Sequence, residues 1–350
     1  MVLSNRLTYW YLQNKRDLPW RKTHEPYQIW LSEIMLQQTR IEQGLPYYNK
    51  FISAYPSVFD LADAPADEVM KLWQGLGYYS RARNLHETAK YVAYKLNGKF
   101  PSDYKGLLKL KGVGNYTASA IASFCYNEPV AVVDGNVYRV LSRIFGMDIP
   151  INSTKGNKEF KELAQELLDK KDPATHNQAM MEFGALHCKP QNPLCASCPF
   201  NDKCLALKEN RINELPVKLK KARVKKRYFN YLVFDLDNDG TILEQRSGKG
   251  IWNGLYQFPL VESAKLINAS ELQKMDSFRE IVNNDNYSIE LFNEDPVVHK
   301  LSHQHLYTRF WLVNSKEVNA ETISLQTVLD YPVPVLIGNF LNEYLPDDYK

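Results

Sequence analysis

The chain has 350 residues and a formal net charge of +3, so it is long enough for two or three domains and only mildly basic. It contains no run of 18 apolar residues, and its first ten residues lack the apolar core of a signal peptide. We therefore expect a cytoplasmic protein without a membrane segment. The charge alone neither requires nor excludes a polyanion partner.

Helix signals dominate the chain up to its last cysteine. Pro26 suits the first turn of a helix, which we expect to run through Ile29, Trp30, Ile34 and Met35. Further helices are predicted at 67–75, 80–96, 103–110, 116–126, 136–145 and 157–170. Residues 1–204 are thus predicted to form an all-α part.

A basic segment and then a change of pattern follow. Seven of the twelve residues 216–227 are Lys or Arg and none is acidic, so we take 205–227 as a linker. A solvated linker and one that also contacts phosphate explain this segment equally well. Strands are predicted at 228–236, 241–246 and 310–313, with a turn at 237–240. Residues 228–350 are therefore predicted to form a smaller α+β domain.

The segment 107–118 joins two predicted helices through a turn that contains Gly112 and Gly114. Glycines let the backbone come close to a ligand, and the amides of such a turn can converge on a phosphate. A plain helix–helix turn is the alternative, although one glycine usually suffices for it. The pattern is that of a helix-hairpin-helix, which binds DNA without regard to its sequence.

Glu33 lies on the predicted helix that begins at Pro26. By helical spacing it shares a face with Ile29, Trp30 and Leu36, which predicts a desolvated carboxyl group with a raised pKa. A general acid at neutral pH needs such a pKa. A glutamate at the rim of a pocket, paired with an arginine, explains the position at least as well.

Asp134 follows the apolar run 129–133 and precedes a predicted helix, so it suits an N-cap. The amides and dipole of that helix would favour the ionised carboxylate. An ionised Asp and a protonated Glu in one pocket would suit cleavage through a sugar cation, as in glycoside hydrolysis.

Four of the five cysteines lie within 17 residues, with six, two and five residues between them: Cys188, Cys195, Cys198 and Cys204. Four nearby thiolates hold zinc or an iron–sulfur cluster. The gaps lack the two short hooks of a zinc site and favour a 4Fe–4S cluster without proving it. Two disulfides in a secreted loop are the other alternative.

These motifs together resemble the adenine DNA glycosylases of the MutY type, within the helix-hairpin-helix and iron–sulfur superfamily that includes endonuclease III. The matching stretches span 18–204: 18–21, 32–39, 75–85, the Gly-x-Gly hairpin with 116–118, 133–140, and the four cysteines. The resemblance implies a helical domain at about 25–128 and an iron–sulfur domain made of the N-terminal segment and 129–204.

The resemblance also implies roles for single residues. Glu33 would protonate N7 of a flipped adenine, and Asp134 would stabilise the deoxyribose cation, by charge or by transient covalent bonding. Tyr116 and Asn136 would support them. The adenine pocket would consist of Trp20, Arg21 and Gln178. Residues implied to contact DNA are Gln38, Tyr78, Arg81, Arg83, Lys111, Gly112 and Gly114, and the four cysteines would hold a 4Fe–4S cluster.

Position 116 separates two branches of this superfamily. The lyases have a lysine there, whose amine forms a Schiff base with the sugar, and a tyrosine cannot do so. Tyr116 therefore predicts a chiefly monofunctional enzyme. Lys111 stands where many relatives have proline, and we expect it to add a phosphate contact.

The C-terminal part resembles the Nudix-like domain of the same family through residues 250–259. A Nudix hydrolase needs a Glu-Glu pair that binds magnesium, and Arg279-Glu280 is followed by none, so we predict no hydrolase activity. The family reads 8-oxoguanine with a Phe-Ser-His loop, which corresponds here to Leu301, Ser302 and His303. A metal site or ordinary surface histidines remain alternatives for His299, His303 and His305.

We therefore expect a monomeric base-excision repair enzyme, associated with the nucleoid, that removes adenine opposite 8-oxoguanine or guanine in double-stranded DNA. Three alternatives stay open: a bifunctional glycosylase that acts on damaged or mismatched thymine, a hydrolase of oxidised dGTP, and a non-enzymatic iron–sulfur protein that scans DNA.

Overall fold

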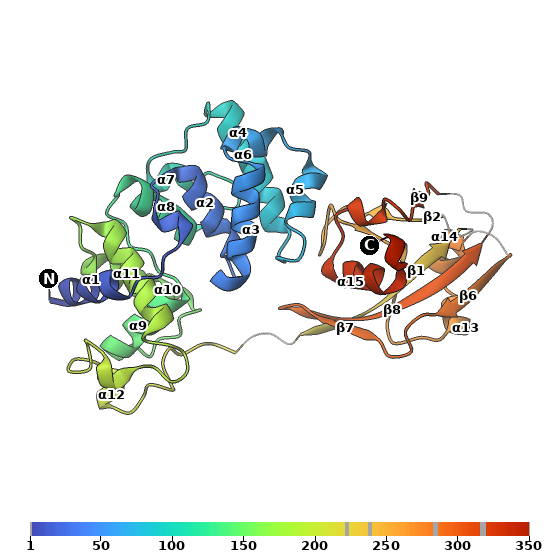
Figure 1. Cartoon of the computed structure of the whole chain (residues 1–350). Helices are drawn as coiled ribbons and strands as arrows, with labels where there is room; N and C mark the ends of the chain where they lie inside the picture. Colours follow the sequence, from blue (N-terminus) through green and yellow to red (C-terminus); the bar gives the residue numbers. More distant parts are fainter. Residues whose placement is uncertain (1, 221–223, 237–239, 283–285, 316–319, 350) are drawn as a thin grey trace. The chain divides into compact units, whose positions relative to one another are not determined.

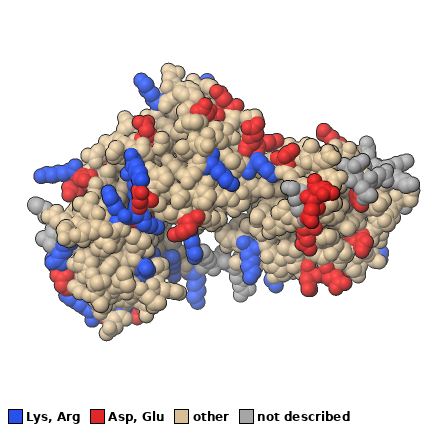
Figure 2. All heavy atoms as spheres, in the orientation of Figure 1, with Lys and Arg blue, Asp and Glu red and all other residues tan. Residues whose placement is uncertain are grey.

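The computed structural model describes residues 2–220, 224–236, 240–282, 286–315 and 320–349 (Figure 1). They form two compact units, Met1–Asp63 with Asn84–Lys220, and Ala64–Arg83 with Lys221–Lys350. Among the described residues, no helix combines the length and the apolar character that crossing a bilayer requires. Figure 2 shows Lys and Arg side chains interspersed with Asp and Glu over the visible face, as a net charge of +3 suggests.

The first unit is helical, as predicted. Its helices are α1 (Val2–Asn14), α2 (Pro26–Met35), α3 (Ile41–Ala54), α4 (Val58–Asp63), most of α6 (Ser80–Lys95), α7 (Tyr104–Leu107), α8 (Asn115–Tyr126), α9 (Gly135–Phe145), α10 (Thr154–Leu167), α11 (Pro173–Leu186) and α12 (Leu205–Lys208). The predicted helices at 80–96, 116–126 and 136–145 are confirmed to within one residue. The helix predicted at 103–110 is one turn long, because the next amides, Lys109 and Leu110, already donate three residues back, to Gly106 and Leu107, instead of four.

Two helical layers meet where the site lies. Helix α2 packs against α3 and α8, whereas α11 packs against α1 and α9 around Val140, Phe160 and Phe183. The buried side chain of Asn177 on α11 ties the layers together. Its amide donates to Ser123 Oγ on α8 (2.9 Å) and to the Val130 carbonyl, and its Oδ1 accepts from the Val132 amide (3.0 Å).

The second unit contains α5 (Ala66–Leu72), the start of α6, and a sheet ordered β5-β1-β8-β6 in which β7 also pairs with β8. These strands are β1 (Lys225–Asp235), β5 (Leu260–Ser263), β6 (Tyr287–Leu291), β7 (Val297–Lys300) and β8 (Gln304–Ser315). Helices α13 (Ala269–Leu272) and α14 (Asp276–Val282) supply core residues on one face. On the other, Phe340 of α15 (Val335–Tyr344) stacks on Phe310. The predicted α+β architecture is confirmed.

Two sequence predictions need correction here. Residues 241–246 are not one strand: β2 (Gly240–Thr241) pairs with β9 (Ile323–Ser324), and β3 (Glu244–Gln245) pairs with β4 (Tyr256–Gln257). The buried residues Ile242 and Leu243 carry the chain between these sheets. The predicted turn at 237–240 lies mostly outside the described residues.

The linker predicted at 205–227 is also too long. Ala206 and Leu215 form a small core with Cys204, so this segment belongs to the helical unit, and β1 already begins at Lys225. The apolar residues of 205–215 are interspersed with charged and amide residues, so the sequence gives no clear sign of this packing. Of the remaining residues, 221–223 lie outside the described ranges.

Candidate active site

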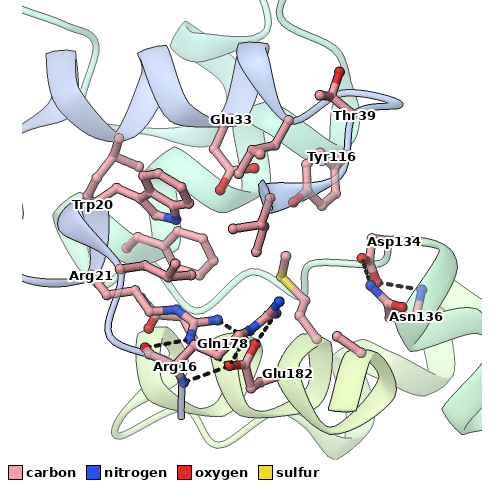
Figure 3. Close-up of a pocket in the computed structure, with 17 residues that line it drawn as sticks. Arg16, Trp20, Arg21, Glu33, Thr39, Tyr116, Asp134, Asn136, Gln178 and Glu182 are labelled. Carbon is pink, nitrogen blue, oxygen red and sulfur yellow. Dashed lines mark hydrogen bonds and ion pairs between the residues drawn. The ribbon is translucent and has the colours of Figure 1, made fainter. Parts of the chain in front are cut away.

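A cavity of about 170 Å³ opens in the helical unit, between the layer of α2 and α8 and the layer of α9 and α11 (Figure 3). It could hold several waters, since each occupies about 30 Å³ in the liquid. Its lining includes all seven residues assigned from the sequence to the catalytic centre and base pocket: Trp20, Arg21, Glu33, Tyr116, Asp134, Asn136 and Gln178.

Glu33 points into this cavity from the last turn of α2, and only 5% of the residue is exposed. Burial, with a smaller contribution from nearby Asp134, raises the pKa of its carboxyl group, the Tyr116 hydroxyl and Arg21 oppose the rise, and the resulting pKa is about 7. The raised pKa keeps the protonated form of this carboxyl group accessible at neutral pH. The desolvation expected from its apolar helix face is present.

Tyr116 is the second residue of α8, directly after the Gly-x-Gly turn, and it is a hydrogen-bond partner of Glu33. Burial, together with the carboxylates of Glu33 and Asp134, raises the pKa of its hydroxyl well above the usual value. The phenol thus stays protonated and can donate to the Glu33 carboxylate.

Asp134 caps the N-terminus of α9, as predicted. Its Oδ1 accepts from the amides of Asn136 (2.9 Å) and Val137 (2.8 Å), and its Oδ2 accepts from Asn136 Nδ2 (2.8 Å). Burial nevertheless raises its pKa, although these three bonds and Arg139 lower it. The sequence indicated the capping bonds but not the desolvation, because the opposing wall of the cavity comes from distant elements.

An ion-pair network that sequence reasoning missed lies across the cavity from Glu33 (Figure 3). Glu182 on α11 accepts from Arg21 Nη1 (2.9 Å) and Nη2 (2.8 Å) and from Arg16 Nε (2.9 Å) and Nη2 (2.6 Å). Although burial raises it, these hydrogen bonds lower the pKa of Glu182 to about 2. The network holds Arg21 in place. No motif in the sequence links these residues, which lie more than 160 positions apart.

Two further side chains complete the pocket. The Tyr11 hydroxyl donates to Gln178 Oε1 (2.6 Å), so the amide nitrogen of Gln178 remains as a donor. Trp20 is buried and packs edge to face on Tyr48, with ring centroids 5.0 Å apart. Together they offer one polar and one aromatic contact to a flat ligand.

A chain of contacts joins the cap of α9 to the cysteine loop. Arg139 donates from Nη2 to Asn136 Oδ1 (2.8 Å) and to the Gly184 carbonyl (2.7 Å), and from Nε to the Cys188 carbonyl (2.7 Å). Gly184 is required here, because a Cβ atom at this position would lie 2.6 Å from the Asn136 Cβ and 2.9 Å from its carbonyl oxygen. Asn136 is therefore fixed from both sides.

The four cysteines of the loop line one pocket, next to Arg143. Arg143 donates to the carbonyls of Lys189 (2.7 Å), Pro190 (3.1 Å) and Leu215 (3.1 Å), and its Nη1 lies 3.5 Å from Cys188 Sγ. In the part of the chain that the structure describes, no three His, Cys, Asp or Glu side chains are arranged around a single ion.

The residues predicted to contact DNA have different surroundings. Gln38 and the half-exposed Tyr78 both have left-handed backbones, with φ of 60° and 49°, which non-glycine residues adopt rarely and often at functional sites. Gly112 has a φ of +78° and Gly114 caps α8, so the hairpin turn forms as predicted. Lys111 is exposed and pairs with Glu87.

Arg81 departs from its predicted role as a DNA contact. It is 7% exposed, donates to the carbonyls of Leu76 (3.3 Å) and Gly77 (3.0 Å), and lies over Trp73. This placement favours a role in holding the loop that presents Tyr78. Its neighbour Arg83 donates to the Asn253 carbonyl.

In the second unit, Ser302 and His303 are exposed in the loop between β7 and β8, with Ser302 Oγ 3.4 Å from His303 Nδ1.

Comparison with protein families gives two matches. Residues 31–170 match the HhH-GPD superfamily base excision DNA repair proteins, and residues 230–343 match the NUDIX domain. The two matches agree with the helical and α+β parts.

Several relatives are named adenine DNA glycosylase. One from Buchnera aphidicola subsp. Baizongia pistaciae is 36% identical over 90% of this chain and 87% of the relative. One from Buchnera aphidicola subsp. Acyrthosiphon pisum is 30% identical over 97% of both. The Homo sapiens relative is 45% identical over 57% of this chain and 38% of its own length. Among solved structures, a thermostable thymine-DNA glycosylase matches with a TM-score of 0.56 and 31% identity, over 59% of this chain and 96% of that one.

Proposed function

The chain belongs to the adenine DNA glycosylases, the base excision repair enzymes whose helical part is of the HhH-GPD superfamily, and from this we propose which base pair it acts on and how. Its substrate is adenine opposite 8-oxoguanine, and less efficiently adenine opposite guanine, in double-stranded DNA. The enzyme flips the adenine into the cavity, which costs least at a mispair.

The pairing of Glu33 and Asp134 in one cavity carries the proposal. Glu33, whose pKa is about 7, gives its proton to N7 of the flipped adenine, so that the base leaves neutral. The electrons of the glycosidic bond go to the base, and the sugar becomes a cation. Asp134 is held by three hydrogen bonds from the start of α9 and stabilises that cation until water adds to the sugar carbon.

The remaining pocket residues position the base. Trp20 offers an aromatic face, and the amide nitrogen of Gln178 donates to an acceptor nitrogen of adenine. Arg21 is held by Glu182 and borders the same space. Tyr116 orients Glu33 and brings no amine, so no Schiff base forms and the product is an intact abasic site.

The cysteine loop fits a 4Fe–4S cluster. Four thiols line one pocket, and Arg143 places a positive charge beside Cys188. Cys188, Cys195, Cys198 and Cys204 would hold the cluster, whose contribution is to order the loop. Arg139 connects this loop to Asn136, so loop order supports the position of Asp134.

The NUDIX-type domain reads the base opposite adenine. The exposed hydroxyl of Ser302 and imidazole of His303 can hydrogen-bond the edge that distinguishes 8-oxoguanine from guanine. Because no Glu-Glu pair follows Arg279-Glu280, this domain hydrolyses no nucleotide. The enzyme acts as a cytoplasmic monomer, associated with the nucleoid through DNA.

One experiment tests the substrate. Single-turnover cleavage is measured on duplexes with adenine opposite 8-oxoguanine, guanine or cytosine, and on one with thymine opposite guanine, because a thymine-DNA glycosylase is among the structural relatives. We expect the rates to fall in the first three in that order and no thymine release. Faster release of thymine than of adenine would contradict the proposal.

A further inference from the structure

One corner of the sheet in the second unit is uncovered and combines aromatic with basic side chains. Lys226, Tyr228, Val298, Lys300, His305 and Tyr307 are paired across β1, β8 and β7 and point to the same side of the sheet. We call these six residues the tyrosine–lysine face. None of them belongs to the core that α13 and α14 cover, which begins further along the same strands at Leu232 and Trp311.

The face has two rows. In the first, Tyr228 is opposite Tyr307 and Tyr307 is opposite Val298; in the second, Lys226 is opposite His305 and His305 is opposite Lys300. The two tyrosine rings stack, with centroids 5.3 Å apart, and Lys226 Nζ lies 5.7 Å from the Tyr307 ring. Val298 is 41% exposed, and both lysines are exposed.

The charges of this face are not neutralised by nearby acids. Within the described ranges, no ion pair includes Lys226 or Lys300; the acid next to this corner, Glu262, pairs with Arg227 (2.6 Å) and is aligned with Phe229, on the opposite side of the sheet. A protein that leaves a valine and two lysines exposed beside two partly exposed, stacked tyrosines presents a binding surface.

The chemistry of the face selects nucleic acid. Aromatic rings beside basic groups bind DNA or RNA strands, because bases stack on the rings and cations contact the phosphates. The basic row runs across three neighbouring β-strands and is therefore about 10 Å long. Over that length one strand of a DNA duplex carries about three phosphates. A protein partner with acidic side chains would explain the exposed lysines but not the stacked tyrosine rings.

The position of the face indicates which of the two DNA strands it contacts. Lys300 and His305 are the paired residues at the base of the loop that holds Ser302 and His303. We propose that the tyrosine–lysine face binds the DNA strand that carries 8-oxoguanine, next to the lesion, with phosphates along the basic row and a base or sugar against the tyrosines. The inference rests on the proposed function for the identity of that strand.

The test uses the full-length protein with Glu33→Gln, which holds the substrate uncleaved, and a labelled duplex with adenine opposite 8-oxoguanine. Lys226→Ala and Lys300→Ala are compared with Lys225→Ala. Lys225 is exposed on the same strand, but it pairs with Gln304 and points to the opposite side of the sheet, so it is a matched control of equal charge.

We expect each of the two lysine variants to lower the slope of log affinity against log salt by about 0.9, the value for one phosphate contact, and Lys225→Ala to leave it unchanged. Tyr307→Leu should weaken binding by about 5-fold or more, the effect of one lost stacking contact, whereas Tyr307→Phe should not. Hydroxyl-radical footprints of Lys226→Ala should lose protection on the 8-oxoguanine strand.

Equal slopes for Lys226→Ala and Lys225→Ala would overturn the inference, as would unchanged affinity of Tyr307→Leu. Thermal unfolding of each variant separates lost contacts from lost folding, and Tyr307→Phe keeps the stacked ring. Failure of the proposed function looks different: the protein without the Glu33 change would then leave adenine in the duplex, whatever these variants do to binding.

Discussion

The Tyr116 hydroxyl and the Glu33 carboxyl group are hydrogen-bond partners in a cavity whose burial raises the pKa of both. The two groups belong to different helices, α8 and α2, and neither is fully charged at neutral pH. Their pairing places an acid and its orienting donor at one point of the pocket, and the first three predictions depend on it.

Glu33→Gln should lower the single-turnover rate by about 10²–10⁴-fold, the usual contribution of a placed proton donor. Because Glu33 must be protonated to act, the rate of the unchanged enzyme should fall as pH rises above its pKa of about 7, and the variant should lack this fall. Rates are measured at saturating enzyme in a series of buffers from about pH 5.5 to about pH 9, in steps of about one pH unit. Near-normal cleavage by the variant would rule out Glu33 as the acid.

The same substitution should change stability in a pH-dependent way. A pKa raised by folding from 4.5 to about 7 contributes stability that is present below pH 4.5 and is lost as pH rises through 7. The shift corresponds to about 3 kcal/mol, at 1.36 kcal/mol per unit. Urea unfolding at low and high pH should therefore show Glu33→Gln gaining on the unchanged protein as pH rises. A constant difference would mean that the pKa of Glu33 is not raised.

Tyr116→Lys should introduce strand cleavage. An amine at this position lies beside Asp134 and Glu33 and can attack the sugar carbon, which gives a Schiff base that borohydride traps. The comparison is Tyr116→Phe, which removes the hydroxyl without adding an amine and should slow base removal without nicking. Efficient trapping by the unchanged enzyme would argue for the bifunctional alternative.

Cys198→Ser should yield protein with little iron and weaker DNA binding. Cys125→Ser is the matched control, since Cys125 lies on α8, outside the loop, and does not line the cysteine pocket. We expect the control to keep its iron and its brown colour. Zinc instead of iron in the unchanged protein would make the assignment of a 4Fe–4S cluster wrong.

Ser302→Ala combined with His303→Ala should reduce the preference for 8-oxoguanine over guanine. Each lost base contact is worth about 1–3 kcal/mol of discrimination. Leu301→Ala should matter less, because Leu301 lacks the ring found at this position in the family. The ratio of single-turnover rates on the two duplexes is measured at one salt concentration, since phosphate contacts make affinity salt-dependent. An unchanged ratio would place lesion reading in the helical unit.

The sequence predicts the site best where chemistry depends on local pattern. Helical spacing placed Glu33 among apolar residues, the N-cap rule placed Asp134, and glycines marked the hairpin. It failed where contacts join distant segments. Glu182 gives no local signal because its partners, Arg16 and Arg21, are far from it in the sequence. The burial of Arg81 depends on its contact with Trp73 and on the loop that follows Trp73.

Strand boundaries were hard to predict for a related reason. The turn signal at 237–240 fits a hairpin in which 241–246 returns along the preceding strand, but the partners of that segment are β9 and β4, which no local pattern indicates. The parallel pairing of β1 with β8, nearly 80 residues later, gives this sheet its core.

The hydrogen bond between the Val132 amide and Asn177 makes local opening of the site measurable by hydrogen exchange. The Val132 amide is buried and donates to Asn177 Oδ1, so it can exchange its hydrogen with solvent only when α11 separates from the segment that leads to Asp134. The exchange rate of this single amide therefore measures how often the segment that positions Asp134 separates from α11. It does so without substrate, and it separates variants that loosen the site from those that alter its chemistry alone.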